Sequence, residues 1–346
     1  MKFLRILLLP FAIIYGVITS IRNFFFDKGI LKSYSFDIPI IAVGNLSVGG
    51  TGKTPQIEYL IRLLSSNYKV ATLSRGYKRK SKGFVLANSD SNPEVSGEVS
   101  GEILGDEPFQ IHQKFPNITV AVDANRKNGI EQLLSLNDKP EVILLDDAFQ
   151  HRKVKAGFYV LLSSYNDLFC DDFILPTGNL RESRAGAKRA DVIIVTKCPE
   201  NLSEIERETI KKKIGLEVPI YFSYINYDDL VYNQNESKKV TEIKKVDKLL
   251  LAGIAKPNPF FAYLQTEKDV KLVYPDHHHF SEKDILDIEK KANNKLIITT
   301  EKDYVRLKNK NIKSLFYLPI KSRFVYNEAD FDKIILDYVG KSTRNR

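Results

Sequence analysis

Short apolar runs alternate with amphipathic stretches along most of the chain after Pro39. Between Pro39 and residue 200, six runs are rich in aliphatic and β-branched residues. They lie at positions 40–43, 70–73, 119–122, 142–145, 159–162 and 192–195. The stretches between them, such as 56–64 and 126–136, have helical spacing of apolar residues. Continuous apolar strands that alternate with helices indicate a parallel sheet covered by helices on both faces.

The alternation weakens between Glu200 and Lys245, where charged residues are frequent, and then returns. Further strands are expected at 249–251, 270–273, 296–298 and 315–318, with helices at 257–264 and 282–291. We therefore predict an α/β core at residues 33–200 and a smaller C-terminal α/β lobe at residues 201–346. The segment 88–103 is rich in Ser, Gly and Glu and is expected to form a mobile surface loop.

An uncharged apolar run at residues 6–21 lies between Arg5 and Arg22. As a helix it would span roughly 24 Å, which is less than the roughly 30 Å hydrocarbon core of a bilayer. Basic flanking residues and three consecutive Phe suit an anionic cytoplasmic membrane surface. The run therefore predicts a membrane-associated helix within residues 1–32, which would cross with local thinning or lie partly inserted.

The same run has two other interpretations. A cleaved signal peptide is disfavoured, because no small-residue cleavage site closes the run and charges resume at once. A helix buried in the core of a soluble protein has the same composition and remains the main alternative.

Composition limits the class of protein. The 346 residues are 43% hydrophobic, which supports a folded core. Lys and Arg number 52 against 43 Asp and Glu, and this net charge of +9 suits an anionic partner. Only Cys170 and Cys198 are present, without a CxxC pair, which argues against a disulfide framework or a structural zinc site.

The strongest motif is the sequence GNLSVGGTGKT at residues 44–54, which follows an apolar strand and opens an amphipathic helix. This is the context of a phosphate-binding loop, in which backbone N–H groups and the helix N-terminus surround phosphate oxygens. Lys53 would reach the β- and γ-phosphates of ATP, and the Thr54 hydroxyl would hold Mg²⁺. Ser47 stands where the general pattern has Gly. The predicted nucleotide-binding residues are Ser47, Val48, Gly49, Gly50, Thr51, Gly52, Lys53 and Thr54.

A second signal is the acidic pair Asp146 and Asp147 at the end of the strand expected at 142–145. Ligands of open α/β sheets bind at the carboxyl ends of the strands, and Mg²⁺ is typically held by one or two carboxylates. Asp pairs are also common turn residues. Together with the phosphate-binding loop, this pair predicts a P-loop NTPase-type fold and a protein that uses ATP and Mg²⁺.

With both motifs in hand, the chain resembles the tetraacyldisaccharide 4'-kinases of lipid A biosynthesis. The resemblance rests on GNLSVGGTGKTP at 44–55, LSRGY at 73–77, GDEP at 105–108, DDAFQHR at 146–152, LRE at 180–182, PDHH at 275–278 and TTEKD at 299–303. It implies a kinase that uses ATP and Mg²⁺ to phosphorylate the 4'-hydroxyl of a lipid-linked glucosamine disaccharide 1-phosphate. It also implies an inner-membrane enzyme with its catalytic part on the cytoplasmic face. The segment GIAKP at 253–257 departs from the GIGNP-like turn expected there.

The resemblance also implies roles for individual residues. Asp106 and His277 would form a catalytic dyad beside Lys53, although the sequence alone reads Asp106 as a loop acid and the three His of 277–279 as a polar turn or a metal site. Glu107 would join Thr54, Asp146 and Asp147 near the metal. The expected substrate-binding residues are Arg75, Arg126, Gln150, His151, Arg181 and Glu182.

Structural hydrogen bonds, or a solvated basic face, are the alternatives for most of these substrate-binding residues, and also for Arg184. The segment 195–197 is expected to edge the adenine pocket.

Two other functional classes remain open. A membrane-associated P-loop NTPase switch would hydrolyse nucleotide with water, and a basic nucleic-acid-binding ATPase would require a module that the sequence does not contain. Cys198 and Pro199 follow Lys197, so the Asp of a guanine-reading NKxD motif is missing. The expected partners are the acylated disaccharide 1-phosphate and lipids of the inner leaflet, with no nucleic acid and no obligate protein partner evident.

Overall fold

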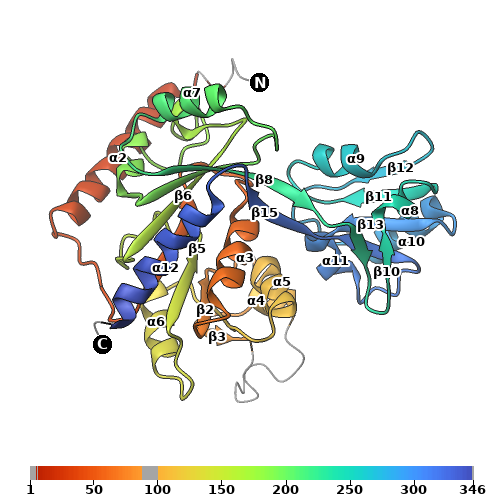
Figure 1. Ribbon diagram of the computed structural model, residues 1–346, viewed down its shortest axis with the longest axis horizontal. Helices are drawn as coiled ribbons and strands as arrows, with labels where there is room; N and C mark the ends of the chain where they lie inside the picture. The colour runs from red at the N-terminus through yellow and green to blue at the C-terminus, as the bar shows by residue number, and fades with distance from the viewer. Residues whose placement is uncertain (1–4, 6, 88–99, 345–346) are drawn as a thin grey trace.

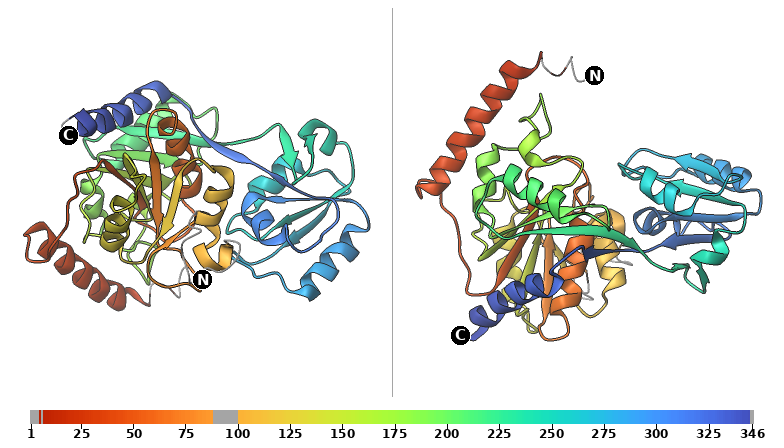
Figure 2. Two further views of the ribbon diagram at one scale, coloured as in Figure 1. Left: turned by 90° about the horizontal axis from the view of Figure 1, so that it is seen from below. Right: turned by 45° about the horizontal axis from the view of Figure 1, so that its top comes forward.

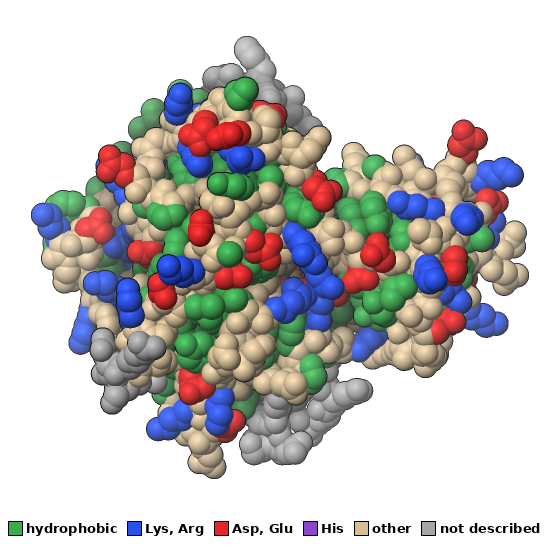
Figure 3. Space-filling view, viewed as in Figure 1, with side chains coloured by type: hydrophobic (Ala, Val, Ile, Leu, Met, Phe, Trp, Pro, Cys, Tyr) green, Lys and Arg blue, Asp and Glu red, His purple; other side chains and the backbone are tan. Residues whose placement is uncertain are grey.

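The computed structural model describes residue 5, residues 7–87 and residues 100–344. In this part of the chain, a large α/β core and a smaller α/β lobe lie side by side, and a long N-terminal helix lies along the outside of the core (Figures 1 and 2). The space-filling view shows that the molecule narrows between the core and the small lobe (Figure 3).

The core is built on one large sheet. Its strands are β1 (Ile40–Asn45), β2 (Val70–Ser74), β3 (Val85–Leu86), β4 (Thr119–Val122), β5 (Val142–Asp146), β6 (Phe158–Ser164), β7 (Val192–Thr196), β8 (Ile220–Tyr227) and β15 (Ile320–Phe324). The order is β15-β8-β7-β6-β1-β5-β2-β4-β3. All neighbours from β8 to β4 pair in parallel, and β15 and β3 add antiparallel edges. The six strands expected before residue 200 are all present.

Helices cover both faces of this sheet. They are α3 (Lys53–Leu64), α4 (Gly101–Leu104), α5 (Asp106–Lys114), α6 (Arg126–Leu134), α7 (Glu204–Ile214) and α12 (Glu328–Arg344), with short 3-10 turns η1 (Phe169–Asp171) and η2 (Arg184–Arg189). In β1, Ile41 and Val43 join the apolar cluster of α3 and α12, whereas Ile40 and Ala42 join that of α6. Burial on two faces explains the unbroken apolar runs of the strands. The expected fold class is confirmed.

The small lobe has its own sheet and apolar clusters. Its strands are β9 (Leu230–Tyr232), β10 (Ser237–Lys239), β11 (Lys248–Ala252), β12 (Val270–Val273), β13 (Leu296–Thr300) and β14 (Leu315–Leu318), in the order β10-β9-β14-β13-β11-β12. Its helices are α8 (Val240–Ile243), α9 (Asn258–Leu264), α10 (Glu282–Ala292) and α11 (Glu301–Leu307). The last four strands pair in parallel, as the returning α/β pattern predicts.

The sheets divide the chain differently from the expected boundary near residue 200. The chain leaves the core along β8 and returns along β15, and these two strands pair antiparallel from Ser223 with Phe324 to Tyr227 with Ile320. Helix α12 then packs on the core through Phe331, Ile335 and Val339, which are all fully buried. Residues 201–227 and 320–344 thus belong to the core. Strand β8 pairs with β7 of the core sheet, β15 pairs with β8, and α12 packs on the core.

Helix α2 (Leu9–Asp27) is the N-terminal apolar helix, and it is mostly exposed. Only Ala12, Gly16 and Phe26 are buried against the core, while Phe11, Ile13, Ile14, Val17, Ile18, Ile21 and Phe24 are each about half exposed or more. A helix buried in the core does not fit this exposure. Among the described residues, α2 is the one helix long and apolar enough to span a membrane.

The segment expected to be a mobile loop at 88–103 is only partly described. Residues 88–99 lie outside the described residues, and residues 101–103 belong to α4 rather than to a loop. Helix α4 leads directly through Gly105 into α5.

Gly44 in β1 lies against Phe149, which follows the acidic pair at the end of β5. A Cβ atom at Gly44 would lie 2.7 Å from the Cβ and 2.9 Å from the backbone N of Phe149. The absence of a side chain at Gly44 therefore lets the acidic loop approach the phosphate-binding loop, because a backbone nitrogen cannot move aside as a flexible side chain does.

We predict that Gly44→Ala lowers the free energy of unfolding by roughly 1–3 kcal/mol, as overpacking typically does. Gly50→Ala is the control, because a Cβ there would meet only Lys197 Nζ, at 3.9 Å. Denaturant unfolding of both variants measures the effect. Equal stability of the two variants would show that the contact of Gly44 with Phe149 tolerates a methyl group.

Candidate active site at the junction of core and small lobe

The phosphate-binding loop joins β1 to α3 at the carboxyl edge of the sheet. Gly49 and Gly52 have φ values of 112° and 85°, which side-chain-bearing residues rarely adopt. Lys53 Nζ lies 3.1 Å from Asn45 Oδ1 and 3.5 Å from Asp147 Oδ1, so its side chain folds back over the loop. The loop thus has the conformation in which backbone N–H groups and a helix N-terminus face a phosphate.

The end of β7 supports this loop from the other side. The Thr196 hydroxyl donates to Thr51 O at 2.7 Å, and Lys197 Nζ donates to Gly50 O at 2.6 Å. Burial and the nearby Lys256 lower the pKa of Lys197. The segment 195–197, expected to edge the adenine pocket, therefore holds two carbonyl groups of the phosphate-binding loop.

The acidic pair ends β5, which is the neighbour of β1 in the sheet. Val43 is in register with Asp146, so the pair lies beside the start of the phosphate-binding loop. Burial and the adjacent Asp147 raise the pKa of Asp146 to about 6. Although burial alone would raise it, the charges of Lys53 and Arg181 lower the pKa of Asp147. Arg181 Nη1 contacts both carboxylate oxygens of Asp147 at 3.0 Å.

This strand end fits a magnesium ion. Asp146 Oδ1 is buried and has no hydrogen-bond partner among the described residues, so one carboxylate oxygen is available as a ligand. The described part of the chain contains no group of three or more His, Cys, Asp or Glu that could hold a metal ion. The unpaired carboxylate oxygen of Asp146 suits Mg²⁺, which is typically bound by one or two carboxylates together with nucleotide phosphates and water.

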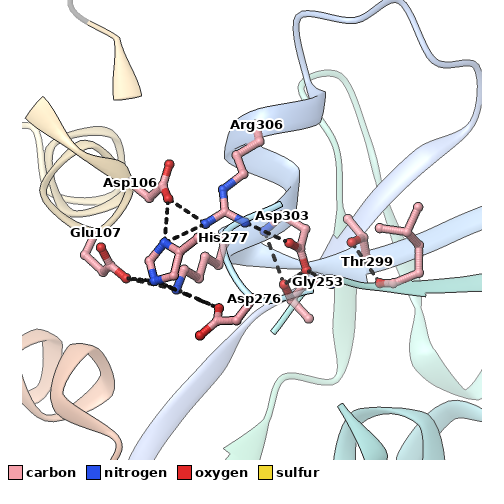
Figure 4. Close-up of polar contacts among 11 residues, drawn as sticks. Asp106, Glu107, Gly253, Asp276, His277, Thr299, Asp303 and Arg306 are labelled. Carbon is pink, nitrogen blue, oxygen red and sulfur yellow. Dashed lines mark hydrogen bonds and ion pairs between the residues drawn. The ribbon is translucent and has the colours of Figure 1, made fainter. Parts of the chain in front are cut away.

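Asp106 and His277 come from different lobes and meet at the junction (Figure 4). Asp106 is the first residue of α5, and His277 lies in the loop after β12 with a positive φ of 59°. His277 Nδ1 lies 3.0 Å from Asp106 Oδ2. Burial alone would raise the pKa of Asp106, but the hydrogen bonds from His277 and Arg306 together lower it.

Helix α11 of the small lobe completes the cluster. Arg306 Nη2 lies 2.5 Å from Asp106 Oδ2, and Lys302 Nζ lies 3.0 Å from His277 Nε2 and 3.0 Å from Glu107 Oε1. The Glu107 carboxylate therefore points into this cluster, where Lys302 contacts it. Lys302 belongs to the motif TTEKD at 299–303, but the sequence pattern assigned it no role.

A cavity of about 520 Å³ opens beside the dyad, lined by residues of the loop after β2. Its lining includes Arg75, Tyr77, Lys78, Arg79 and Lys82. The Tyr77 ring meets the His277 ring edge to face at a centroid distance of 5.5 Å. Arg75 is exposed at this cavity, where its guanidinium can meet an anionic ligand.

Arg126 and Glu182 are buried, contrary to the expectation that they contact substrate. Arg126 is 2% exposed and donates to Asp123 O at 2.6 Å and to Asp146 O at 3.1 Å. Glu182 is 3% exposed and accepts from Asn23, Gln150 and Arg189 at 2.6, 3.0 and 2.7 Å. These two side chains orient the acidic strand end and the loop that carries Arg181.

Gln150 and His151 lie between these elements. Gln150 Nε2 donates to Asn45 O at 2.9 Å as well as to Glu182, so it links the phosphate-binding loop to the loop at 180–182. Burial and the nearby Arg126 lower the pKa of His151 to about 4, so its imidazole is neutral near pH 7. Arg184 lies away from this network and donates to Asp172 O at 2.8 Å.

Comparison with known proteins agrees with this geometry. The family described as tetraacyldisaccharide-1-P 4'-kinase matches residues 4–340. A tetraacyldisaccharide 4'-kinase of Flavobacterium psychrophilum is 67% identical over the whole of both chains, and that of Bacteroides thetaiotaomicron is 46% identical over 98% of this chain and 94% of its own. The crystal structure of LpxK from Aquifex aeolicus in complex with ATP has a TM-score of 0.77 and 31% identity, covering 97% of this chain and 99% of that one.

We predict that Lys53→Ala weakens binding of ATP roughly 10- to 100-fold, the loss expected for one charge-assisted hydrogen bond. Binding of ADP should weaken less, because Lys53 is expected to reach the terminal phosphates. Calorimetric titration of both nucleotides measures this difference. The control is Lys155→Ala, which removes the same charge from an exposed position between β5 and β6. Unchanged ATP affinity in folded Lys53→Ala would contradict the assignment of the loop.

Proposed function

The chain belongs to the tetraacyldisaccharide-1-phosphate 4'-kinase family, and on this premise we propose how its residues carry out the reaction. The enzyme uses ATP to phosphorylate the 4'-hydroxyl of a lipid-linked tetraacyl glucosamine disaccharide 1-phosphate, and the product is a precursor of lipid A. The observation that carries the residue assignment is the contact of Asp106 with His277 at 3.0 Å, in a chain that also brings its phosphate-binding loop and acidic pair together.

In the proposed mechanism, His277 is the base that accepts the proton of the 4'-hydroxyl. Its Nδ1 faces Asp106, so Nδ1 carries the ring proton of the neutral imidazole and the lone pair that accepts a proton lies on Nε2. The hydroxyl oxygen forms a bond to the γ-phosphorus while the bond from that phosphorus to the β–γ bridging oxygen breaks, and ADP leaves. Asp106 stabilises the imidazolium that results, which is the usual contribution of a carboxylate behind a catalytic His.

Lys53 and the phosphate-binding loop, residues 47–54, stabilise the charge that develops on the transferred phosphoryl group. Mg²⁺ would be held by Thr54 and Asp146, with Asp147 and Glu107 close by. When bound, such an ion neutralises phosphate charge and orients the phosphates. The free oxygen of Asp146 supports this assignment.

We assign Arg75 and Arg181 to direct contact with the anionic disaccharide. Arg75 lines the cavity beside the dyad, and Arg181 is part-exposed next to Asp147. Gln150, Arg126 and Glu182 would instead fix these loops in place, since their side chains form hydrogen bonds with other protein groups. His151 would stay on the substrate side, because its buried Nε2 has no hydrogen-bond partner among the described residues.

The enzyme is proposed to work at the cytoplasmic face of the inner membrane. The exposed apolar face of α2 supports this, together with Arg22 and Lys28 at its end. The polar contacts of α2 with the core support a fixed orientation, since Asn23 donates to Glu182 at 2.6 Å. An acylated substrate resides in the bilayer, and an anchored enzyme meets it there.

The experiment that tests the function is incubation with γ-labelled ATP and the lipid-linked disaccharide 1-phosphate, followed by location of the new phosphate. Label at the 4'-position is expected. A membrane-associated NTPase switch would instead release labelled inorganic phosphate whether or not the lipid is present. DNA or RNA is expected to have no effect on the rate.

We predict that Asp106 and His277 act as one unit, so that their substitutions are strongly non-additive. Asp106→Ala and His277→Ala should each lower kcat by about 10²–10⁴-fold, as loss of general-base catalysis does. The double variant should be little slower than the slower single variant. The neighbouring His278→Ala is the control, because His278 pairs with Asp284 instead. Multiplicative losses in the double variant would mean that the two residues act independently.

We predict that removal of residues 1–21 releases the enzyme from membranes while Arg22 and Asn23 keep their contacts with the core. Turnover of bilayer-embedded substrate should fall more than turnover of detergent-dispersed substrate, because the helix supplies proximity rather than chemistry. A second variant, Ile14→Glu with Ile18→Glu, places charges on the exposed face and should act in the same direction. Sedimentation with liposomes measures binding, and equal recovery of all three proteins would refute the anchor.

A further inference from the structure

Helix α11 places two cationic side chains on the catalytic imidazole, and the mechanism above uses neither. Arg306 points from α11 toward the dyad (Figure 4). Lys302 lies four residues earlier in the same helix, so the two side chains share one face of α11. Lys302 Nζ lies 3.0 Å from His277 Nε2, whereas Arg306 Nη2 lies 3.2 Å from His277 Nδ1 and 2.5 Å from Asp106 Oδ2. Each ring nitrogen therefore faces a cation.

The contacts of Lys302 and Arg306 differ in their consequence for His277. Nδ1 faces the Asp106 carboxylate, so the ring proton of a neutral imidazole lies on Nδ1 and the lone pair lies on Nε2. An ammonium group can only donate, so the contact of Lys302 with Nε2 uses this lone pair. The nitrogen that must accept the proton of the hydroxyl is thus already occupied.

All three donors of the Lys302 ammonium have an acceptor in this arrangement. Besides His277 Nε2, its Nζ lies 3.0 Å from Glu107 Oε1 and 3.2 Å from Asp276 Oδ1. The side chain is 20% exposed, at the edge of the junction rather than inside it. A long flexible lysine so placed can exchange these partners for a phosphate without unfolding any element.

The position of α11 itself is fixed. Arg306 Nη1 lies 3.3 Å from Asp303 Oδ1, and the other oxygen of Asp303 accepts from Gly253 N at 2.9 Å. Lys114 of α5 donates to Glu301 at 2.7 Å. The contact of Lys302 with Nε2 therefore follows from how α11 is held between the lobes.

We propose that Lys302 caps the lone pair of His277 Nε2 until the acceptor hydroxyl displaces it, and that the released ammonium then pairs with the γ-phosphate. The proposal rests on His277 being the base. With the cap in place, water cannot give its proton to Nε2, so ATP is not hydrolysed in the absence of the lipid. When the cap is removed, water replaces the sugar hydroxyl: its oxygen bonds to the γ-phosphorus, its proton goes to Nε2, and ADP and inorganic phosphate result.

The first experiment measures the cap directly, without turnover. Diethyl pyrocarbonate acylates an imidazole nitrogen that has a free lone pair, and tandem mass spectrometry of the substrate-free enzyme resolves His277 from His278. Lys302→Met should speed acylation of His277 about tenfold, the equivalent of one lost charge-assisted hydrogen bond. Lys302→Arg should keep the protection. His278, whose Nε2 pairs with Asp284 at 3.1 Å, is the internal reference and should not change.

The second experiment compares ATP consumed with lipid phosphorylated. Lys302→Met should lower transfer and raise lipid-independent hydrolysis, and the added His277→Ala substitution should abolish that hydrolysis. Lys310→Met removes the same charge from an exposed position beyond α11 and should leave both rates unchanged.

A purely structural role of Lys302 would lower transfer with no rise in hydrolysis and no change in His277 acylation, and that result would overturn the proposal. Hydrolysis that persists in the double variant would also overturn it. Normal transfer by His277→Ala would instead overturn the base assignment, so the two failures are distinguishable.

Discussion

The hydrogen bond between Asp106 and His277 requires core and small lobe to be held at one distance, and the rest of the site depends on this constraint. A buried ionic cluster supports it: Lys114 Nζ lies 2.8 Å from Glu58 Oε2 and 2.7 Å from Glu301 Oε1. Glu58 belongs to the helix after the phosphate-binding loop, and Glu301 opens α11. Burial and the charge of Glu58 raise the pKa of Glu301. One ammonium thus ties both lobes to the helix that carries Asp106.

The parallel sheet accounts for the nucleotide side of the site. Strands β1 and β5 are neighbours, and both end at the same edge, so the phosphate-binding loop and the acidic pair meet there. The close approach of Gly44 to Phe149 keeps the distance between the phosphate-binding loop and the acidic loop small. On the other side, Gln150 and Glu182 connect the loop to Asn23 of α2. Helix α2 and the phosphate-binding loop therefore share one hydrogen-bonded network.

Most of the charged side chains at the junction of the two lobes are carried by helices. Asp106 and Glu107 open α5, where the helix dipole favours carboxylates. Lys302 and Arg306 leave α11 one turn apart and reach the same imidazole. His277 lies in a loop with a positive φ, and its ring is held between Asp106 and Lys302. The core thus carries the phosphate-binding loop and the carboxylates, and the small lobe carries His277 and the cations around it.

The sequence by itself determined the alternating α/β pattern, the phosphate-binding loop, the acidic strand end and the apolar N-terminal run, because each depends on residues near one another in the chain. That the apolar helix is exposed was decided by the structure. Family motifs pointed to Asp106 and His277, but no spacing could pair residues 171 positions apart. Only the tertiary structure decided that β8, β15 and α12 belong to the core, that Arg126 and Glu182 are buried, and that Lys302 reaches His277 Nε2. Strand pairing, burial and contacts between lobes arise when distant segments pack, and local sequence does not encode which segments meet.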